Sequence, residues 1–254
     1  MFDLFLDIFA FREPPWTRLD PRLKLLITLT AILCLLLSTR MVLPLAFLGL
    51  SLSGMVALRL PARLIFLRLI VPMNIVALLI LMQAITFGKT ELWTIAFWGG
   101  SWTFWKEGFL QGLLLGSRVL GAVSVLLLFS SMTPAHTIFS ALRWFRVPPG
   151  WVEVALLMYR YTFALLDRAA DVAAAQKVRL GYSGVERSLS SLGSLAGIVL
   201  IHSFDQAART YEAMILRGYK GSIPFAPLPA IPKKVFAYTI LTCGAMGGIT
   251  FLLR

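Results

Sequence analysis

The sequence predicts an all-α integral membrane protein with about five transmembrane helices and a cytoplasmic-facing domain of long amphipathic helices. Three observations lead to this class. First, 58% of the 254 residues are hydrophobic and the mean hydropathy is +0.81, more apolar than a soluble domain requires. Second, several apolar stretches approach the roughly 20 residues that cross a bilayer. Third, residues 132–234 form a more polar segment that is too long to be a simple loop.

The apolar stretches divide the chain into three regions. Residues 1–131 hold an N-terminal segment, 2–11, expected to lie on the membrane surface as an interfacial helix, and four spans. Residues 132–234 form the cytoplasmic-facing domain of amphipathic helices, and residues 235–254 hold the last span. The five predicted spans are Leu23–Thr39, Met41–Leu58, Leu64–Thr86, Phe109–Ser131 and Val235–Leu253.

The charge distribution predicts the orientation in the membrane. The net charge is +12, and nineteen of the 24 Lys and Arg residues fall on one side if the five spans are correct. Because basic residues collect in cytoplasmic loops, the N-terminus is placed in the cytoplasm and the protein in the cell (inner) membrane. The basic character is therefore a topological signal, and we expect a lipid bilayer rather than nucleic acid as the partner. Both cysteines, Cys34 and Cys243, lie in apolar runs and are interpreted as packing residues.

The outer loop between the third and fourth spans, residues 87–106, is rich in tryptophan. Two aromatic, partly alternating runs flank Gly99-Gly100 in this loop, a pattern that indicates a small β-hairpin at the membrane surface. An ordinary aromatic belt at the interface is the alternative.

The segment 132–234 contains two predicted amphipathic helices of about thirty residues, each about 45 Å long. The first starts near Trp151 and the second runs from near Ser188 to Arg217. We interpret them as partly embedded helices, although residues 189–201 could enter the bilayer as a sixth span. Gly193 and Gly197 have the GxxxG spacing that permits close helix packing, either within this domain or with a second membrane protein.

Each of these helices ends in an arginine flanked by apolar or small residues. The two segments are Val178-Arg179-Leu180 and Leu216-Arg217-Gly218. An arginine fork pairs with carboxylates while its stem packs on apolar walls, so two matched segments favour two docking sites for a pair of similar soluble subunits. The alternative is that each arginine only stabilises the C-terminal end of its helix.

No residue pattern in the chain indicates catalysis, a metal site or a bound cofactor. Gly88-Lys89-Thr90 resembles the end of a phosphate-binding loop, but that loop requires glycine at position 83, which is Gln83. Asp167 and Asp171 share a helix face, yet no second acidic pair accompanies them, so a membrane transferase is a remote alternative. Arg118 lies inside the fourth span and is expected to pair within the bundle or with a partner.

Three segments make the chain resemble a known family, the transmembrane T component of energy-coupling factor (ECF) transporters, in the CbiQ-type branch of cobalt importers. The resemblance covers essentially the whole chain. The first Arg segment departs from the family pattern because glycine is delayed to position 181. The segments are Leu19-Asp20-Pro21-Arg22-Leu23-Lys24-Leu25-Leu26, Ala175-Gln176-Lys177-Val178-Arg179-Leu180-Gly181 and Ala213-Met214-Ile215-Leu216-Arg217-Gly218-Tyr219.

The resemblance implies a non-catalytic scaffold that links two ATPase subunits to a small substrate-binding membrane subunit. ATP and magnesium would bind to the ATPase subunits, and the transported metal, cobalt first and nickel second, to the other membrane subunit. The alternative within transport is a permease of a conventional ABC importer, whose coupling motif is echoed by Glu212-Ala213-Met214, Gly218 and Leu228-Pro229. A conventional permease has one such motif, so this alternative does not explain Arg179.

Overall fold

A computed structural model describes residues 20–58, 60–88, 90–97, 100–221 and 232–252. The chain divides into two compact units, one formed by residues 1–138 and 230–254 and the other by residues 139–229. The predicted interfacial helix at residues 2–11 lies outside the described residues.

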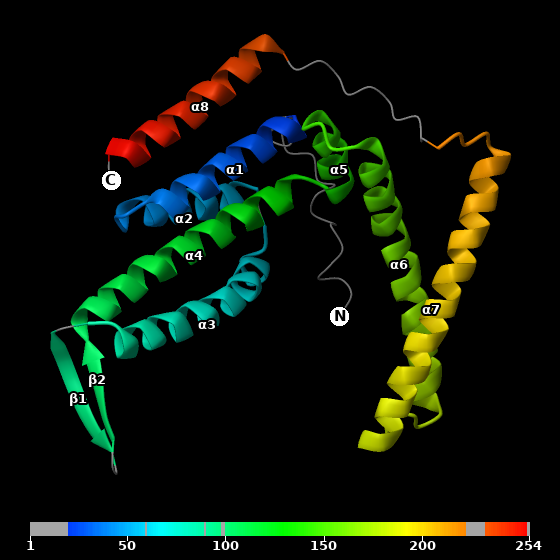
Figure 1. The fold of residues 1–254 in the computed structure, drawn as a ribbon, viewed down its shortest axis with the longest axis horizontal. Helices are drawn as coiled ribbons and strands as arrows, with labels where there is room; N and C mark the ends of the chain where they lie inside the picture. The colour runs from blue at the N-terminus through cyan, green and yellow to red at the C-terminus, as the bar shows by residue number, and fades with distance from the viewer. Residues whose placement is uncertain (1–19, 59, 89, 98–99, 222–231, 253–254) are drawn as a thin grey trace. The chain divides into compact units, whose positions relative to one another are not determined.

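The first unit is a bundle of apolar helices in which α4 contacts three others (Figure 1). Helix α4 packs against α3, α2 and α1, and α8 packs against α1. Every segment predicted to span the membrane is helical, which confirms the all-α class. The helices are α1 (Pro21–Leu37), α2 (Val42–Ala57), α3 (Ala62–Thr86), α4 (Lys106–Met132) and α8 (Lys233–Leu252).

Helix length separates these five helices into two groups. Three of the described helices, α3, α4 and α8, are long and apolar enough to cross a membrane. Helices α1 and α2 have 17 and 16 residues, so each is only about 25 Å long at 1.5 Å per residue. The structure therefore supports a multi-pass membrane protein with three full-length spans and one shorter helical pair.

Close packing of α3 against α4 depends on a row of glycines in α4. A Cβ atom on Gly108 would lie 2.2 Å from the carbonyl oxygens of Gln83 and Phe87, and one on Gly112 would lie 3.0 Å from the Cα of Ile80. Gly116 continues the row one turn later, near Val76. These glycines form a small-residue groove with four-residue spacing, which lets two membrane helices approach closely.

The two aromatic runs between α3 and α4 form the predicted hairpin. Strand β1 (Glu91–Phe97) pairs antiparallel with β2 (Gly100–Trp105), with Ile95 opposite Trp102. A bulge shifts the register between Glu91 and Trp93. The hairpin continues directly into α4, so it links the ends of the two longest helices of this unit.

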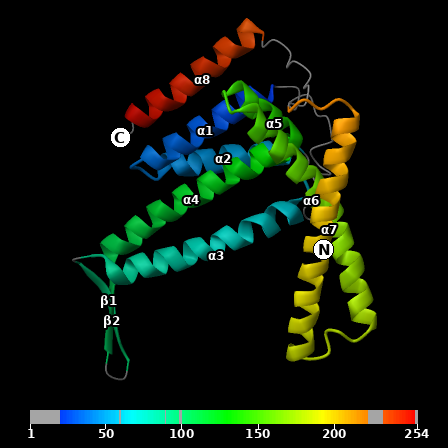
Figure 2. The same ribbon diagram turned by 45° about the vertical axis from the view of Figure 1, so that its right-hand side comes forward.

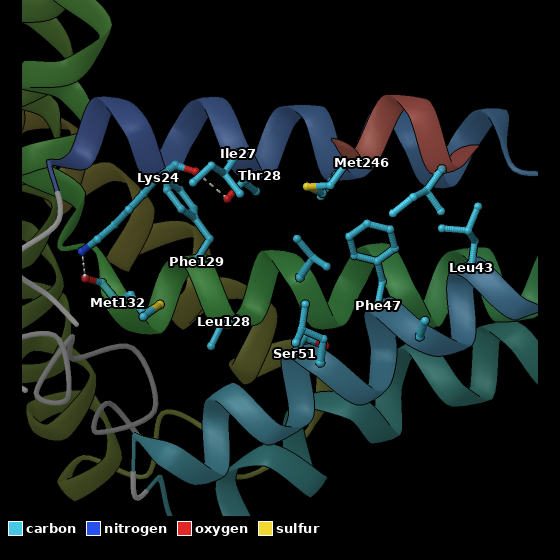
Figure 3. Close-up of a pocket in the computed structure, with 15 residues that line it drawn as sticks. Lys24, Ile27, Thr28, Leu43, Phe47, Ser51, Leu128, Phe129, Met132 and Met246 are labelled. Atoms are coloured by element: carbon cyan, nitrogen blue, oxygen red, sulfur yellow. Dashed lines mark hydrogen bonds between the residues drawn. The ribbon is translucent and has the colours of Figure 1, made fainter. Parts of the chain in front are cut away.

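An apolar cavity of about 540 Å³ lies among α1, α2, α4 and α8 (Figure 3). Its walls include Phe47 of α2, Phe129 of α4 and Met246 of α8. Lys24 lies at one end, where its Nζ donates a hydrogen bond of 3.2 Å to the carbonyl oxygen of Met132. The bond joins the first turn of α1 to the last residue of α4.

The second unit is dominated by an antiparallel pair of long helices, α6 (Pro149–Val178) and α7 (Val185–Leu216) (Figures 1 and 2). The boundary between the two units falls within the short helix α5 (Ala135–Trp144). Pro149 occupies the first turn of α6, where its missing N–H is not needed. The second helix starts at Val185, three residues before the predicted Ser188, because Gly184 provides a left-handed turn with φ +132°.

Candidate coupling interface

Helix α6 ends at Arg179 in a backbone motif that leaves this arginine at the helix terminus. The amide of Leu180 donates to the carbonyl of Lys177 (3.1 Å), and the amide of Gly181 donates to that of Gln176 (2.9 Å). These two bonds define a Schellman motif in which Arg179 is the C-cap residue, directly after the last helical residue, Val178. We call residues 176–182 the Arg179 tip.

Helix α7 ends in the same motif. The amide of Gly218 donates to the carbonyl of Ile215 (2.9 Å), and that of Tyr219 donates to the carbonyl of Met214 (3.0 Å). Arg217 therefore occupies the position in α7 that Arg179 occupies in α6. We call residues 214–219 the Arg217 tip. Because the bonding patterns coincide, the later glycine in the first segment does not lengthen its helix.

The two tips differ at the residue that follows the arginine. This residue must adopt a left-handed backbone, and glycine does so without steric cost. Gly218 has φ +80°, whereas the equivalent residue in the first tip is Leu180, with φ +56°. A branched side chain in this region is uncommon and costs free energy.

Both tips present their arginine and its apolar neighbours to the surroundings. Val178 is 85% exposed, Leu180 is 67% exposed and Leu216 is 88% exposed. Arg179 and Arg217 are exposed as well. Large apolar side chains this exposed beside a cation are typical of residues that become buried against a partner.

Three side-chain hydrogen bonds order the Arg179 tip: two join it to Ser191 near the start of α7, and one lies within the tip. Gln176 donates from its Nε2 to the carbonyl of Ser191 (3.0 Å) and accepts from the hydroxyl of Tyr182 (2.8 Å). Ser191 in turn donates from its Oγ to the carbonyl of Gly181 (2.9 Å). A Cβ on Gly181 would lie 2.6 Å from that hydroxyl, so glycine is required by the close approach of the two helices. The tip is therefore held in one geometry.

The Arg217 tip is joined to α6 by a weaker contact. The hydroxyl of Tyr219 donates to the Oε2 of Glu153 over 3.3 Å, and Glu153 is buried. Burial and, second, the Glu153 carboxylate raise the pKa of Tyr219 above its ordinary value, which keeps the hydroxyl protonated as a donor. Further along the pair, Thr210 donates to the hydroxyl of Tyr161 (2.9 Å).

The two tips lie at opposite ends of the helix pair. Gln176 meets Ser191 at one end and Glu153 meets Tyr219 at the other, which shows antiparallel pairing along the length of the helices. Helix α7 has 32 residues, so the arginines are separated by about 48 Å. The two tips are therefore separate surfaces, one at each end of the helix pair.

The acidic pair considered from the sequence is not part of a metal-binding cluster in the described residues. Asp167 and Asp171 are both exposed on α6. Within the described ranges, no group of three or more His, Cys, Asp or Glu residues is arranged to hold a metal ion.

Arg118 lies in α4 beside the end of α1. Its guanidinium donates a hydrogen bond to the carbonyl oxygen of Ser38, the C-cap residue of α1. Its Nε is buried and has no hydrogen-bond partner among the residues that the structure describes. The position of Arg118 therefore places a cation at the negative end of a short helix that ends beside the middle of α4.

Gly193 and Gly197 lie on α7 where no side chain or backbone of the described residues packs against them. A Cβ at either position would meet no atom within 4 Å. Packing of these glycines within their own domain is therefore not observed there, and contact with a second membrane protein stays a prediction. The glycine groove of α4, which was not identified from the sequence, is where α3 and α4 approach closely.

Comparison with known proteins gives the family. A family model described as CbiQ, cobalt transport protein, matches residues 13–226. An uncharacterized protein of Methanocaldococcus jannaschii is 29% identical over 205 residues, covering 80% of this chain and 76% of its own length. The cobalt transport protein CbiQ of Rhodobacter capsulatus is 35% identical over 94 residues, 37% of this chain and 38% of that protein.

A third relative, from Methanocorpusculum labreanum, is described as a fused cobalt transport protein CbiMQ. It is 29% identical over 146 residues, which are 54% of this chain and 24% of that longer protein. The family match includes both arginine tips and four of the five apolar helices of the first unit. The chain belongs to the CbiQ family of cobalt transport proteins.

Proposed function

We propose that this chain is the scaffold and coupling subunit of an ECF-type importer. Two ATPase subunits bind its Arg179 and Arg217 tips, and closure of the ATPases on ATP moves the α6–α7 pair. That movement reorients a separate, small substrate-binding membrane subunit. The chain itself performs no catalysis and binds no cofactor, while ATP and magnesium bind to the ATPase subunits.

The matched geometry of the two tips is the observation that carries this proposal. Each arginine ends a helix of about thirty residues, each is exposed, and each is followed by a residue in the left-handed region. Helix capping alone explains this arrangement poorly, because the Schellman amides already satisfy carbonyls that a capping guanidinium would bind. The arginine side chains are thus available for carboxylates on a partner.

The family supports the proposed cargo and is consistent with a second membrane subunit. The family is described as one of cobalt transport, so cobalt is the proposed cargo and nickel the second choice. A relative described as a fused CbiMQ protein supports a neighbouring partner, because its CbiQ portion is joined to additional chain. We place the N-terminus in the cytoplasm of a cell with this protein in its inner membrane, since basic residues then lie mainly inside.

The proposal is tested by affinity purification of the full chain from native membranes in mild detergent. Wild type, Arg179→Glu and Arg217→Glu are compared, and the co-purifying proteins are identified by mass spectrometry. We expect two ATPase equivalents with wild type and at least a tenfold loss at each reversed tip, because breaking a buried interfacial ion pair costs about 2–5 kcal/mol. Arg209→Glu, an exposed reversal away from both tips, is the matched control.

Two results would contradict the proposal. ATPase recovery that is unchanged by both reversals would mean that the tips do not bind ATPases. Loss with Arg217→Glu but not with Arg179→Glu would favour a conventional ABC permease, which has one coupling segment for each chain.

A further inference from the structure

We propose that Leu180 is a docking residue whose strained backbone is retained for partner binding, and that the Arg179 tip is consequently the tighter of two unequal ATPase sites. The inference rests on the proposed function, because it assigns an ATPase subunit as the partner of both tips. It adds a difference between the tips and a residue responsible for that difference.

The first step is the strain at Leu180. The residue after a helix C-cap is favoured as glycine, and Gly218 fills this position in the other tip. Leu180 adopts φ +56° with a branched side chain, so the chain carries a local cost that glycine would remove. Strained residues of this kind persist where the side chain serves a function.

The second step is that the Leu180 side chain contributes little to the stability of its own tip. It is 67% exposed, so most of its apolar surface remains in contact with the surroundings. The cost of the left-handed backbone is therefore not offset by burial within the described chain. Burial against a partner would provide the missing compensation, at a position directly beside Arg179.

The third step is preorganisation. Two hydrogen bonds of 3.0 Å or less join the Arg179 tip to Ser191 of α7, and a third ties Tyr182 to Gln176 within the tip. The Arg217 tip is joined to α6, among the described residues, by the longer 3.3 Å bond from Tyr219 to Glu153. A rigid tip loses less conformational freedom on binding. Two exposed apolar residues, Val178 and Leu180, also flank Arg179, while only Leu216 flanks Arg217.

The experiment measures each tip separately in the full chain. Arg217→Glu leaves the Arg179 tip as the only tip expected to bind the ATPase, and Arg179→Glu does the same for the Arg217 tip. The chain is reconstituted in nanodiscs, and the dissociation constant is measured for the ATPase subunit that co-purifies with wild type. We expect the Arg179 tip to bind at least tenfold more tightly than the Arg217 tip.

Leu180 is then varied in the Arg217→Glu background. Leu180→Gly removes both the strain and the apolar side chain, so we expect ATPase binding to weaken on the order of 10- to 100-fold. The same change should raise the melting temperature of the chain by about 2–4 °C. Leu180→Met keeps an apolar side chain and should bind within about threefold of its parent.

The reciprocal change is Gly218→Leu in the Arg179→Glu background. A Cβ at position 218 meets no atom of the described residues within 4 Å, so the substitution creates no clash at Cβ, but it imposes the left-handed strain. We expect tighter ATPase binding at the Arg217 tip together with a lower melting temperature.

The outcomes separate the inference from the proposed function. If Arg179→Glu abolishes binding at its tip but Leu180→Gly binds as tightly as leucine, the inference is wrong and the docking role of the arginines stands. If neither Arg179→Glu nor Arg217→Glu weakens binding, the proposed function itself is wrong. A stabilised Leu180→Gly variant with weakened ATPase binding supports both.

Discussion

Arg118 illustrates how one charged residue is accommodated within an apolar helix. The carbonyl groups at the end of a helix lack intrahelical partners, and hydrocarbon offers them no water. Helix α1 ends beside α4 at Arg118, twelve residues, or about 18 Å, from the start of α4 at Lys106. We infer a structural role in which the guanidinium satisfies the Ser38 carbonyl and neutralises the negative end of α1.

Replacement of Arg118 by methionine should therefore reduce stability. We expect a loss of about 1.5–3 kcal/mol, the range for hydrogen bonds to charged groups, measured as a fall of several degrees in melting temperature. Arg40→Met is the control, because Arg40 is an exposed arginine in the connection between α1 and α2, two residues after Ser38. An unchanged melting temperature with abolished metal uptake would instead assign Arg118 a direct part in transport.

At the same scale, the sequence identified Arg179 and Arg217 but could not reveal the backbone of Leu180. Spacing and composition mark the end of a helix when glycine follows, as at Gly218. Leucine at position 180 carries no such signal, because left-handed leucine is rare and its cost depends on contacts beyond the local sequence. The backbone hydrogen bonds, and not the sequence, show that Leu180 occupies the same position in its tip as Gly218 does in the other.

Among the elements, helix positions were predictable and helix contacts were not. Hydropathy located all five apolar helices, since each is long enough to give a clear signal. Four-residue glycine spacing occurs in both α4 and α7, but from the sequence only the pair in α7 was expected to permit close helix packing. Glycine spacing indicates that helices can approach closely, but only the fold shows that α3 packs in the glycine groove of α4.

Alanine substitution distinguishes the two glycine patterns. Gly108→Ala should destabilise the chain by about 1–3 kcal/mol, because its Cβ would overlap the carbonyl oxygens of Gln83 and Phe87. Gly193→Ala should stabilise it by about 0.5–1 kcal/mol, because the position is helical and open. Melting temperatures in detergent compare the two.

The same alanine at Gly193 also tests the predicted contact with a second membrane protein. Retained stability with reduced recovery of a membrane partner would support that contact. A destabilised Gly193→Ala variant would contradict the open environment of α7.

In the whole molecule, the two units have different structures that suit different roles. The first unit supplies apolar helices and a closely packed α3–α4 pair that stay in the membrane. The second supplies a long antiparallel helix pair with one arginine at each end. In the proposed function, two ATPases bind this pair at points about 48 Å apart, so their closure would act on both ends of the pair.

The most direct test of the coupling role is ATP-driven uptake of radioactive cobalt into proteoliposomes that contain the complete complex. We predict uptake with wild type and with Arg209→Glu, and a loss of at least tenfold with Arg179→Glu or Arg217→Glu when equal amounts of complex are reconstituted. Uptake that continues at the wild-type rate in the double variant Arg179→Glu/Arg217→Glu would contradict the coupling role.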